Sequence, residues 1–231
     1  MEIVSEMILL RIILSLGMLT IGCVLDVWKR EIHDYLWIAF GGVGFALLIF
    51  EPYPIETLFS VLFALIIAPV AFIAWRLGFF GGADAFALIV LAIIAPQITV
   101  TENIVTPFTT LSNAAVLFVV PLIVNVTRNG ILILRKEKIF EGFDEPIFKK
   151  IIASFIGYKA KNPKYGFSIE RKEGEQKKIE LSLHHSENEE FAKKPNTWIT
   201  PGLPYLLLIT GGFIIQLLFG DIILTGLGFG T

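Results

Sequence analysis

Phe79-Phe80-Gly81-Gly82-Ala83-Asp84 places two glycines and a carboxylate between two apolar runs, each long enough to enter a lipid bilayer. The run before it, residues 58–77, has Arg76 as its one charged residue, and the run after it, residues 85–96, has no ionisable side chain. A carboxylate at the edge of a membrane helix costs a few kcal/mol and marks a functional residue by default. Asp84 is therefore the first candidate, and the structural alternative is a helix N-cap preceded by a glycine turn.

The composition points to a membrane protein. Of the 231 residues, 55% are hydrophobic and the mean hydropathy is +0.72, whereas soluble proteins have roughly 45–50% apolar residues. The net charge of −2 gives no basic signature of a nucleic-acid partner. The single cysteine, Cys23, excludes an internal disulfide and a Cys-x-x-Cys metal pair.

Apolar segments long enough to span a bilayer set the expected architecture, because a spanning helix needs about 20 residues. Six such segments are expected: residues 7–27, 35–50, 56–77, 84–100, 109–134 and 203–219. We therefore predict a polytopic α-helical membrane protein with six transmembrane helices and a small cytoplasmic α+β domain between helices five and six. Its expected parts are helices one to five in 1–134, the soluble domain in 135–200, and helix six with the C-terminus in 201–231.

Lysine and arginine set the expected orientation, because cytoplasmic loops carry an excess of both. One set of loops and helix ends holds nearly all of them: Lys29, Arg30, Arg76, and Arg128 onward. The opposite loops, 51–56 and 101–103, have none, and Arg11 alone lies in the other half of a span. The N-terminus is therefore expected outside the plasma membrane, with Asp26, Asp84 and the soluble domain towards the cytoplasm.

The soluble segment shows local patterns of both helix and strand. Residues 146–160 have the period of an amphipathic helix, and 167–171 with 179–183 alternate apolar and polar residues, which predicts a β-hairpin. His184 and His185 are adjacent, so a strand would point them to opposite faces, and we expect a solvated strand end. The prolines in 200–204 predict a non-helical entry to the sixth span.

Asp26 and Asp84 together suggest a hydrolytic reaction. Two carboxylates on different helices at similar depth can hold one water molecule, and close like charges keep one of the two protonated. The ionised carboxylate would act as general base and the protonated one as general acid, so no metal or cofactor is required. As a hypothesis, a helix N-terminus favours Asp84 as the anion and a helix C-terminus favours Asp26 as the acid.

Asp26 also has a structural alternative. Asp26 with Arg30, and Arg30 with Asp34, are spaced i,i+4 and would form an ion-pair ladder on one helix. Each such pair contributes about 0.2–0.5 kcal/mol. That is too little to explain a carboxylate on the apolar side of Trp28.

The residues around both aspartates resemble motifs of the GxGD membrane aspartyl proteases, and among them the archaeal preflagellin peptidases, relatives of bacterial type IV prepilin peptidases. The first motif is Asp26 followed by Lys29-Arg30-Glu31-Ile32 and Asp34, and the second is Gly81-Gly82-Ala83-Asp84. The second departs from Gly-x-Gly-Asp at Ala83, a change of one methyl group that close packing can accommodate. Six spans with a soluble domain before the last also fit this family.

The resemblance implies an aspartyl endopeptidase with Asp26 and Asp84 as its catalytic residues. Its substrate would be a membrane-inserted preflagellin or prepilin-like precursor, cut at the cytoplasmic face to remove a short basic leader. Pro201-Gly202-Leu203-Pro204 resembles the Pro-Ala-Leu motif of presenilin-type proteases, near the catalytic pair. Supporting roles are thereby implied for Lys29, Arg30, Gly81, Gly82, Ala83, Pro201, Gly202, Leu203 and Pro204. Bacterial relatives with paired Cys-x-x-Cys motifs methylate the new N-terminus, and this chain is not expected to do so.

Two other functions remain open from the residues alone. A proton-coupled transporter also uses membrane carboxylates, although both acids here are expected near one face and the two halves show no inverted repeat. A non-catalytic assembly factor would use the soluble domain for docking. Loss of precursor processing in aspartate variants separates the peptidase from both.

Overall fold

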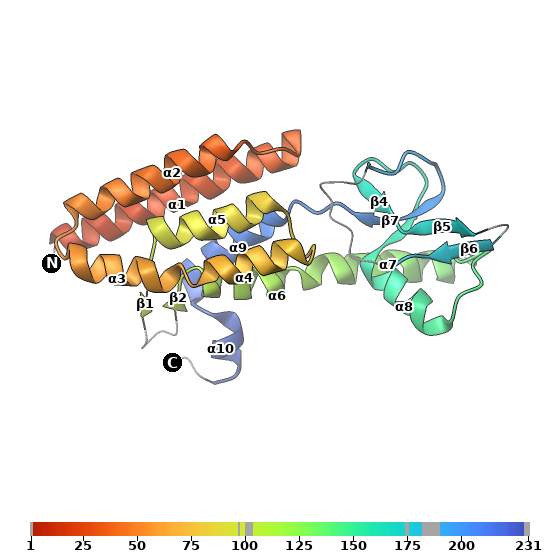
Figure 1. The fold of residues 1–231 in the computed structure, drawn as a ribbon. Helices are drawn as coiled ribbons and strands as arrows, with labels where there is room; N and C mark the ends of the chain where they lie inside the picture. The colour runs from red at the N-terminus through yellow and green to blue at the C-terminus, as the bar shows by residue number, and fades with distance from the viewer. Residues whose placement is uncertain (1, 97, 100–103, 174–175, 182–189, 229–231) are drawn as a thin grey trace. The chain divides into compact units, whose positions relative to one another are not determined.

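The computed structural model describes residues 2–96, 98–99, 104–173, 176–181 and 190–228. The chain forms two compact units: unit 1 comprises Met1–Leu117 and Pro204–Thr231, and unit 2 comprises Phe118–Leu203. Unit 1 is built of helices with one short strand pair, whereas unit 2 combines helices with small sheets (Figure 1).

The helices of unit 1 follow the apolar segments of the sequence. They are α1 (Glu2–Lys29), α2 (Asp34–Leu47) with the 3₁₀ turn η1 (Leu48–Phe50), α3 (Pro54–Ala64), α4 (Ile67–Arg76), α5 (Gly82–Ile94), α6 (Phe108–Leu117), α9 (Tyr205–Phe219) and α10 (Ile222–Gly226). Strands β1 (Ile98–Thr99) and β2 (Ile104–Val105) pair antiparallel between α5 and α6.

Three stretches are long and apolar enough to cross a membrane: Glu6–Lys29, Pro54–Arg76 and Phe108–Leu134. Three shorter apolar stretches accompany them: Asp34–Phe50, Gly82–Ile94 and Tyr205–Phe219. By length and composition, three of the six expected spans are therefore long enough to cross a membrane.

Prolines explain where the helices depart from the expected spans. Pro69 and Pro121 have no N–H to donate to the carbonyl four residues earlier, and the chain turns just before each. The third expected span is thus divided into α3 and α4, and the fifth into α6 and α7 (Val119–Leu134). The expected end of the fourth span at residue 100 is wrong. Helix α5 stops at Ile94, because Ala95 precedes Pro96 and leaves the helical region with φ −127°.

Helix α5 is the innermost helix of unit 1. Ten of its thirteen residues are buried, and it contacts α1, α2, α3, α4 and α9. Leu88 and Leu91 are fully buried in the same apolar cluster as Met18 of α1 and Phe213 of α9. The carboxylate at the start of α5 is thereby carried into the interior.

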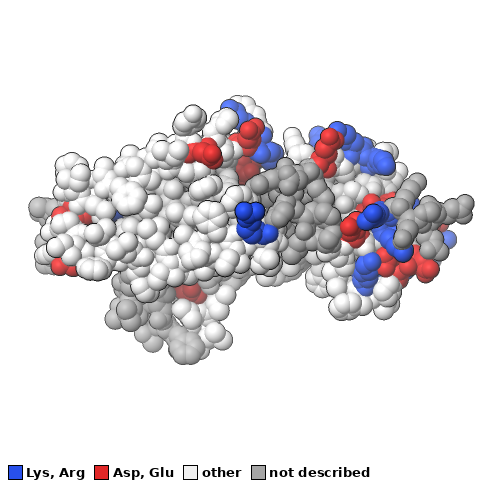
Figure 2. Space-filling view, in the orientation of Figure 1, with Lys and Arg blue, Asp and Glu red and all other residues white. Residues whose placement is uncertain are grey.

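The outer faces of unit 1 are apolar as well. Large apolar side chains are exposed along α1 to α4, for example Ile13 at 56%, Ile38 at 67%, Phe59 at 67% and Ile73 at 60%. On the face shown in Figure 2, the middle of unit 1 carries few charged residues, and its charges gather towards the two ends. Such continuous exposed apolar surface is far larger than a soluble monomer shows and is typical of a membrane protein.

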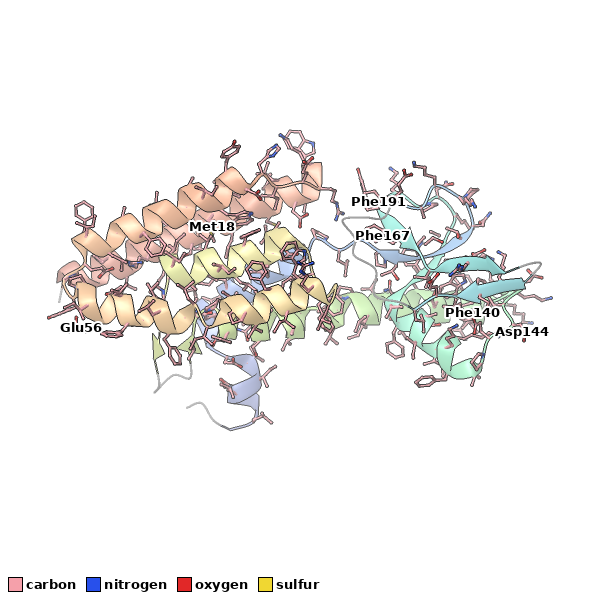
Figure 3. All side chains as sticks on the ribbon, viewed as in Figure 1. Met18, Glu56, Phe140, Asp144, Phe167 and Phe191 are labelled. Carbon is pink, nitrogen blue, oxygen red and sulfur yellow. The ribbon has the colours of Figure 1, made fainter. Side chains whose placement is uncertain are left out.

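Unit 2 contains α7, α8 (Ile147–Ile156) and five strands. Strands β3 (Tyr158–Ala160), β7 (Thr197–Pro201) and β4 (Gly166–Ser168) form an antiparallel sheet in that order, and β5 (Glu170–Glu173) pairs with β6 (Gln176–Ile179). Trp198 is fully buried in the core of this unit. Its ring stacks on Phe140, labelled in Figure 3, with centroids 4.6 Å apart, and its Nε1 donates to the Ile139 carbonyl at 2.8 Å.

The predicted β-hairpin is confirmed, with different strand bounds. Glu170 of β5 pairs with Ile179 of β6, whereas Phe167, expected in the same strand as Glu170, belongs to β4 and pairs with Thr200 of β7. The chain changes sheet at Ile169, whose N–H donates to the Trp198 carbonyl at 3.0 Å. The register therefore depends on a strand near residue 198 that a local pattern cannot reveal.

Two other expectations for this segment have different outcomes. The amphipathic helix expected over 146–160 ends earlier, at Ile156, because Gly157 is extended with φ −154° and ψ −177° and β3 begins at Tyr158. The non-helical entry to the last long helix is confirmed, since β7 ends at Pro201 and α9 begins at Tyr205. His184 and His185 lie outside the described residues.

Candidate active site

Asp84 lies in the first turn of α5, three residues after the N-cap, Gly81. Its Oδ2 accepts a hydrogen bond from the Gly81 N–H at 2.9 Å, and the residue is only 7% exposed. The carboxylate therefore satisfies one of the free N–H groups of the helix start. Asp84 is not the N-cap itself, which is Gly81.

Asp26 is partly buried in the last turn of α1. Helix α1 ends at Lys29, Arg30 has a positive φ of 58°, and α2 begins at Asp34. Residues 26, 30 and 34 thus do not share one helix, so the ion-pair ladder along a helix face does not form. Arg30 still interacts electrostatically with Asp26, which leaves its positive charge near the carboxylate.

The fold brings the two carboxylates into one electrostatic neighbourhood. Helices α1 and α5 contact each other, and Asp84 interacts electrostatically with Asp26. The two residues are far apart in the sequence and come together because α5 packs as the central helix of unit 1. That the two carboxylates act as a pair stays a prediction.

Two aromatic residues that the sequence did not single out adjoin the same place. The rings of Phe80 and Tyr205 stack with centroids 5.3 Å apart and an interplanar angle of 24°. Tyr205 also interacts electrostatically with Asp84. The available signal was its position directly after Pro204, at the start of an apolar span.

Neither the backbone conformation nor the surrounding space requires a glycine at position 81. Gly81 has φ −79°, which any residue can adopt, and a Cβ there would lie 3.5 Å from Asp84 Oδ2, an ordinary contact distance. Gly82 is buried in the first turn of α5. Ala83 packs against the apolar cluster of unit 1, so the methyl group at the departing motif position has a place.

The remaining motif residues belong to different parts of the chain. Lys29 is exposed at the end of α1, and Pro204 is the N-cap of α9 in unit 1. Pro201, Gly202 and Leu203 belong to unit 2, where the Gly202 N–H donates to the Tyr165 carbonyl at 2.9 Å. Tyr205, the residue that directly follows Pro204, interacts electrostatically with Asp84.

The chemistry available at this place is that of paired carboxylic acids. One carboxylate is almost buried, one is partly exposed near a cation, and a phenol adjoins the buried one. Within the described part of the chain, no group of three or more His, Cys, Asp and Glu side chains could hold a metal ion. General acid–base catalysis is within reach of such a pair.

Comparisons with known proteins agree with this chemistry. Residues 13–132 match the type IV leader peptidase family, and residues 149–222 match the archaeal peptidase A24 C-terminus, type II. The chain is 30% identical to a preflagellin peptidase of Methanococcus maripaludis over 234 aligned residues, which cover 92% of this chain and 96% of that protein. The first match alone includes both aspartates and the whole of α1 to α6 beyond residue 12. This chain therefore belongs to the type IV leader peptidase family and is a peptidase.

Proposed function

We propose that this protein is a membrane aspartyl endopeptidase that removes the short basic leader of preflagellin and related type IV pilin-like precursors. The observation that carries the proposal is that Asp26, in the last turn of α1, and the buried Asp84, in the first turn of α5, stand on two helices that contact each other. This arrangement occurs in a chain similar along 92% of its length to a protein named preflagellin peptidase. The aspartates support the mechanism, and the similarity supports the substrate.

The two aspartates act as one acid–base unit on a water molecule. The ionised carboxylate takes a proton from water while the water oxygen attacks the carbonyl carbon of the scissile peptide. The protonated carboxyl gives its proton to the carbonyl oxygen, and the resulting gem-diol collapses with cleavage of the C–N bond and protonation of the leaving amine. Such a pair shares its protons, so its two titration steps belong to the pair.

Tyr205 and Arg30 flank this pair and support it in different ways. Arg30 places a positive charge near Asp26. Tyr205, held by stacking on Phe80, lies near the buried Asp84, where interactions between charges are stronger than in bulk water.

The proposed setting is the plasma membrane, with all six apolar stretches inserted. The exposed apolar faces of α1 to α4 would contact lipid, because their large apolar side chains are otherwise open to water. By the distribution of lysine and arginine, Asp26, Asp84 and unit 2 face the cytoplasm and the N-terminus faces outward. A substrate helix inserted in the same bilayer would present its leader junction at the depth of the pair.

The proposal is tested by processing of a tagged preflagellin in membranes that carry the wild type, Asp26→Asn or Asp84→Asn. Asparagine keeps the shape and removes the ionisation, so both variants should accumulate uncleaved precursor, with rates reduced by at least about 10³-fold. Asp144→Asn is the matched control, because Asp144 is an exposed aspartate of unit 2 outside both motifs, and it should cleave normally.

Membrane content of each variant is measured by immunoblot against the same tag position. Normal cleavage by either Asp26→Asn or Asp84→Asn, at wild-type abundance, would return that aspartate to a structural role and reject the two-aspartate peptidase.

A further inference from the structure

Helix α8 of unit 2 is apolar on its outer face as well as on its inner face. Only Lys149, Lys150 and Ser154 of its ten residues are polar. On the inner face, Ala153 is fully buried in the core around Trp198. A helix that is apolar nearly all round is normally buried on every side, either in a large core or in a membrane. The outer face of α8 must therefore pack against something other than the core of unit 2.

Four large apolar side chains form a single stripe on this outer face. Ile147, Ile151 and Phe155 are spaced i, i+4 and i+8, and Phe148 lies beside them, so that the four occupy about 100° of the helix circumference. Their exposed fractions are 78%, 50%, 46% and 70%, in that order. None of the four belongs to the apolar core that the described residues of unit 2 form. An exposed apolar patch of this kind marks an interaction surface.

Two buried asparagines of α7 attach the end of α8 to that helix. Asn125 Nδ2 donates to the Phe155 carbonyl at 3.0 Å. Asn129 Nδ2 donates to the Ser154 carbonyl at 3.0 Å and to the Gly157 carbonyl at 2.8 Å. The last carbonyls of a helix have no partner within it, and these bonds satisfy them. Helix α8 thus lies beside α7 (Figure 1), and the asparagines set the level at which it ends.

That level coincides with the end of a membrane span. Helix α7 completes the apolar stretch Phe108–Leu134, which is long enough to cross a membrane. Arg128 is the first charged residue of this stretch, and it lies between Asn125 and Asn129. At a rise of about 1.5 Å per residue, the two asparagines lie about 8 and 14 Å before the end of α7. Since the head-group region is about 5–8 Å thick on each side of the hydrocarbon, the end of α8 is held close to the membrane surface.

The charge around α8 complements an anionic membrane surface. Residues 128–150 contain six lysines and arginines and four carboxylates, and so carry a net charge of +2. Arg128 and Arg135 are exposed on α7 and just after it, and Glu145 is already paired with Lys149 at 2.8 Å. Basic residues at a membrane surface are attracted to anionic head groups. The same charge disfavours a basic protein segment as the occupant of the stripe.

We propose that α8 is an interfacial helix whose outer stripe is buried in the bilayer that α7 crosses. Helices of this kind lie in the membrane surface with the apolar face about 5–10 Å deep, at the boundary between head groups and acyl chains. Unit 2 is thereby held on the membrane by α8 as well as by α7. The proposal rests on the membrane setting of the proposed function and is independent of the aspartate chemistry.

The test measures the surroundings of single nitroxide labels on the full-length chain in vesicles of phosphatidylcholine and phosphatidylglycerol. In a Cys23→Ala background, Ile147→Cys, Ile151→Cys and Phe155→Cys each place one label on the outer stripe. Collisions with oxygen, which concentrates in lipid, and with a nickel chelate, which stays in water, are measured by power-saturation EPR. At all three positions, collisions with oxygen should be frequent and collisions with the nickel chelate should be rare.

Lys161→Cys is the matched control. Lys161 is an exposed residue of unit 2 that lies outside α8, so a label there should collide mainly with the nickel chelate. The ratio of oxygen to nickel collisions should therefore be higher at each stripe position than at Lys161→Cys. Agreement among three separate positions shows that the result does not depend on one label's effect on folding.

Two results would overturn the proposal. Nickel collisions at the stripe as frequent as at Lys161→Cys would show that the stripe faces water. Rare collisions with both reagents would show that protein covers it, as a second copy of the chain or a bound precursor would.

Precursor cleavage is measured in the same vesicles, so that the two proposals are tested separately. A stripe in water with cleavage intact rejects the interfacial helix alone. A stripe in lipid with no cleavage by the unlabelled wild type leaves the interfacial helix standing and rejects the peptidase proposal alone.

Discussion

At the scale of single residues, Asp84 is subject to opposing influences. Burial at 7% exposure disfavours a charge there, whereas the Gly81 N–H at 2.9 Å and the start of α5 favour one. Asp26 is more accessible and has the positive charge of Arg30 nearby. The two carboxyl groups therefore have different environments. Such a difference allows one carboxyl group to serve as general acid and the other as general base.

Tyr205→Phe should lower the rate of cleavage without loss of folded protein. Phenylalanine keeps the ring that stacks on Phe80 but removes the hydroxyl dipole from the neighbourhood of Asp84. Loss of this polar group beside Asp84 should lower kcat while KM changes little. Steady-state kinetics with a peptide precursor measures both constants, and an unchanged kcat would contradict a role for the hydroxyl.

At the scale of elements, close helix packing holds α9 beside α6. A Cβ on Gly212 of α9 would lie 2.4 Å from the Thr110 carbonyl oxygen and 2.8 Å from the Ala114 nitrogen. Both are backbone atoms of α6, so the helices would have to separate. Gln216 and Thr110, hydrogen bonded at 2.6 Å, lock the same pair of helices in the buried interior.

Gly212→Ala should therefore destabilise unit 1 by about 1–3 kcal/mol, the usual cost of overpacking. Thermal unfolding in detergent, followed by loss of helical circular dichroism, measures the effect. Gly42→Ala in α2 is the control, because nothing lies within 4 Å of a Cβ there and alanine favours the helix. A melting temperature of Gly212→Ala equal to that of Gly42→Ala would show that the backbones can separate freely.

In unit 2, Glu170 joins the β5–β6 hairpin to β7. Burial by itself raises the pKa of Glu170, but hydrogen bonds from Lys177 at 2.7 Å and from the backbone and side chain of β7 outweigh it, so the pKa is lower than usual. A carboxylate with a lowered pKa in the folded state stabilises that state above its unfolded pKa of 4.5 and loses this contribution as the pH falls through the folded value.

Unit 2 should accordingly resist urea equally well from pH 7 to pH 5 and become weaker below about pH 4.5. Fluorescence of the buried Trp198, in a chain whose other three tryptophans are replaced by phenylalanine, reports the unfolding midpoint. Glu170→Gln should be less stable at pH 7 and should lose part of the acid dependence. An identical pH profile in wild type and Glu170→Gln would contradict the role of this carboxylate.

The sequence predicted the helices better than the sheets, for a physical reason. Helical boundaries depend on residues close in the chain, and Pro204 marked the non-helical entry to the last span as expected. The breaks associated with Pro69 and Pro96 are equally local, but they fell inside spans that were expected to be continuous. The strand register near Ile169 depends on Trp198, and the neighbourhood of Asp84 depends on Tyr205. Both are set by packing between distant segments. The aspartates could be singled out because a charge beside an apolar run is conspicuous without any knowledge of its neighbours.

At the scale of the whole molecule, the chain separates an apolar helical unit from a small α+β unit. The first carries both aspartates, and its outer faces are apolar, so the site and the lipid-facing surface belong to the same unit. The second has its own core around Trp198. The proposed topology places this second unit in the cytoplasm and the N-terminus outside.

Cysteine labelling tests this topology. In a Cys23→Ala background, Tyr53→Cys and Lys161→Cys each give a single exposed thiol, one in the turn before α3 and one in unit 2. A membrane-impermeant maleimide should label Tyr53→Cys on intact cells and Lys161→Cys only after permeabilisation. The reverse pattern would contradict the orientation derived from lysine and arginine.

The central claim is that Asp26 and Asp84 act together on one water molecule, and single-turnover cleavage by the double variant tests it most directly. If the two carboxylates form one catalytic unit, removal of the second costs almost nothing once the first is gone. The rate of Asp26→Asn/Asp84→Asn should then equal that of either single variant within about threefold. If the rate of the double variant is instead reduced by the product of the two single reductions, the two aspartates act independently.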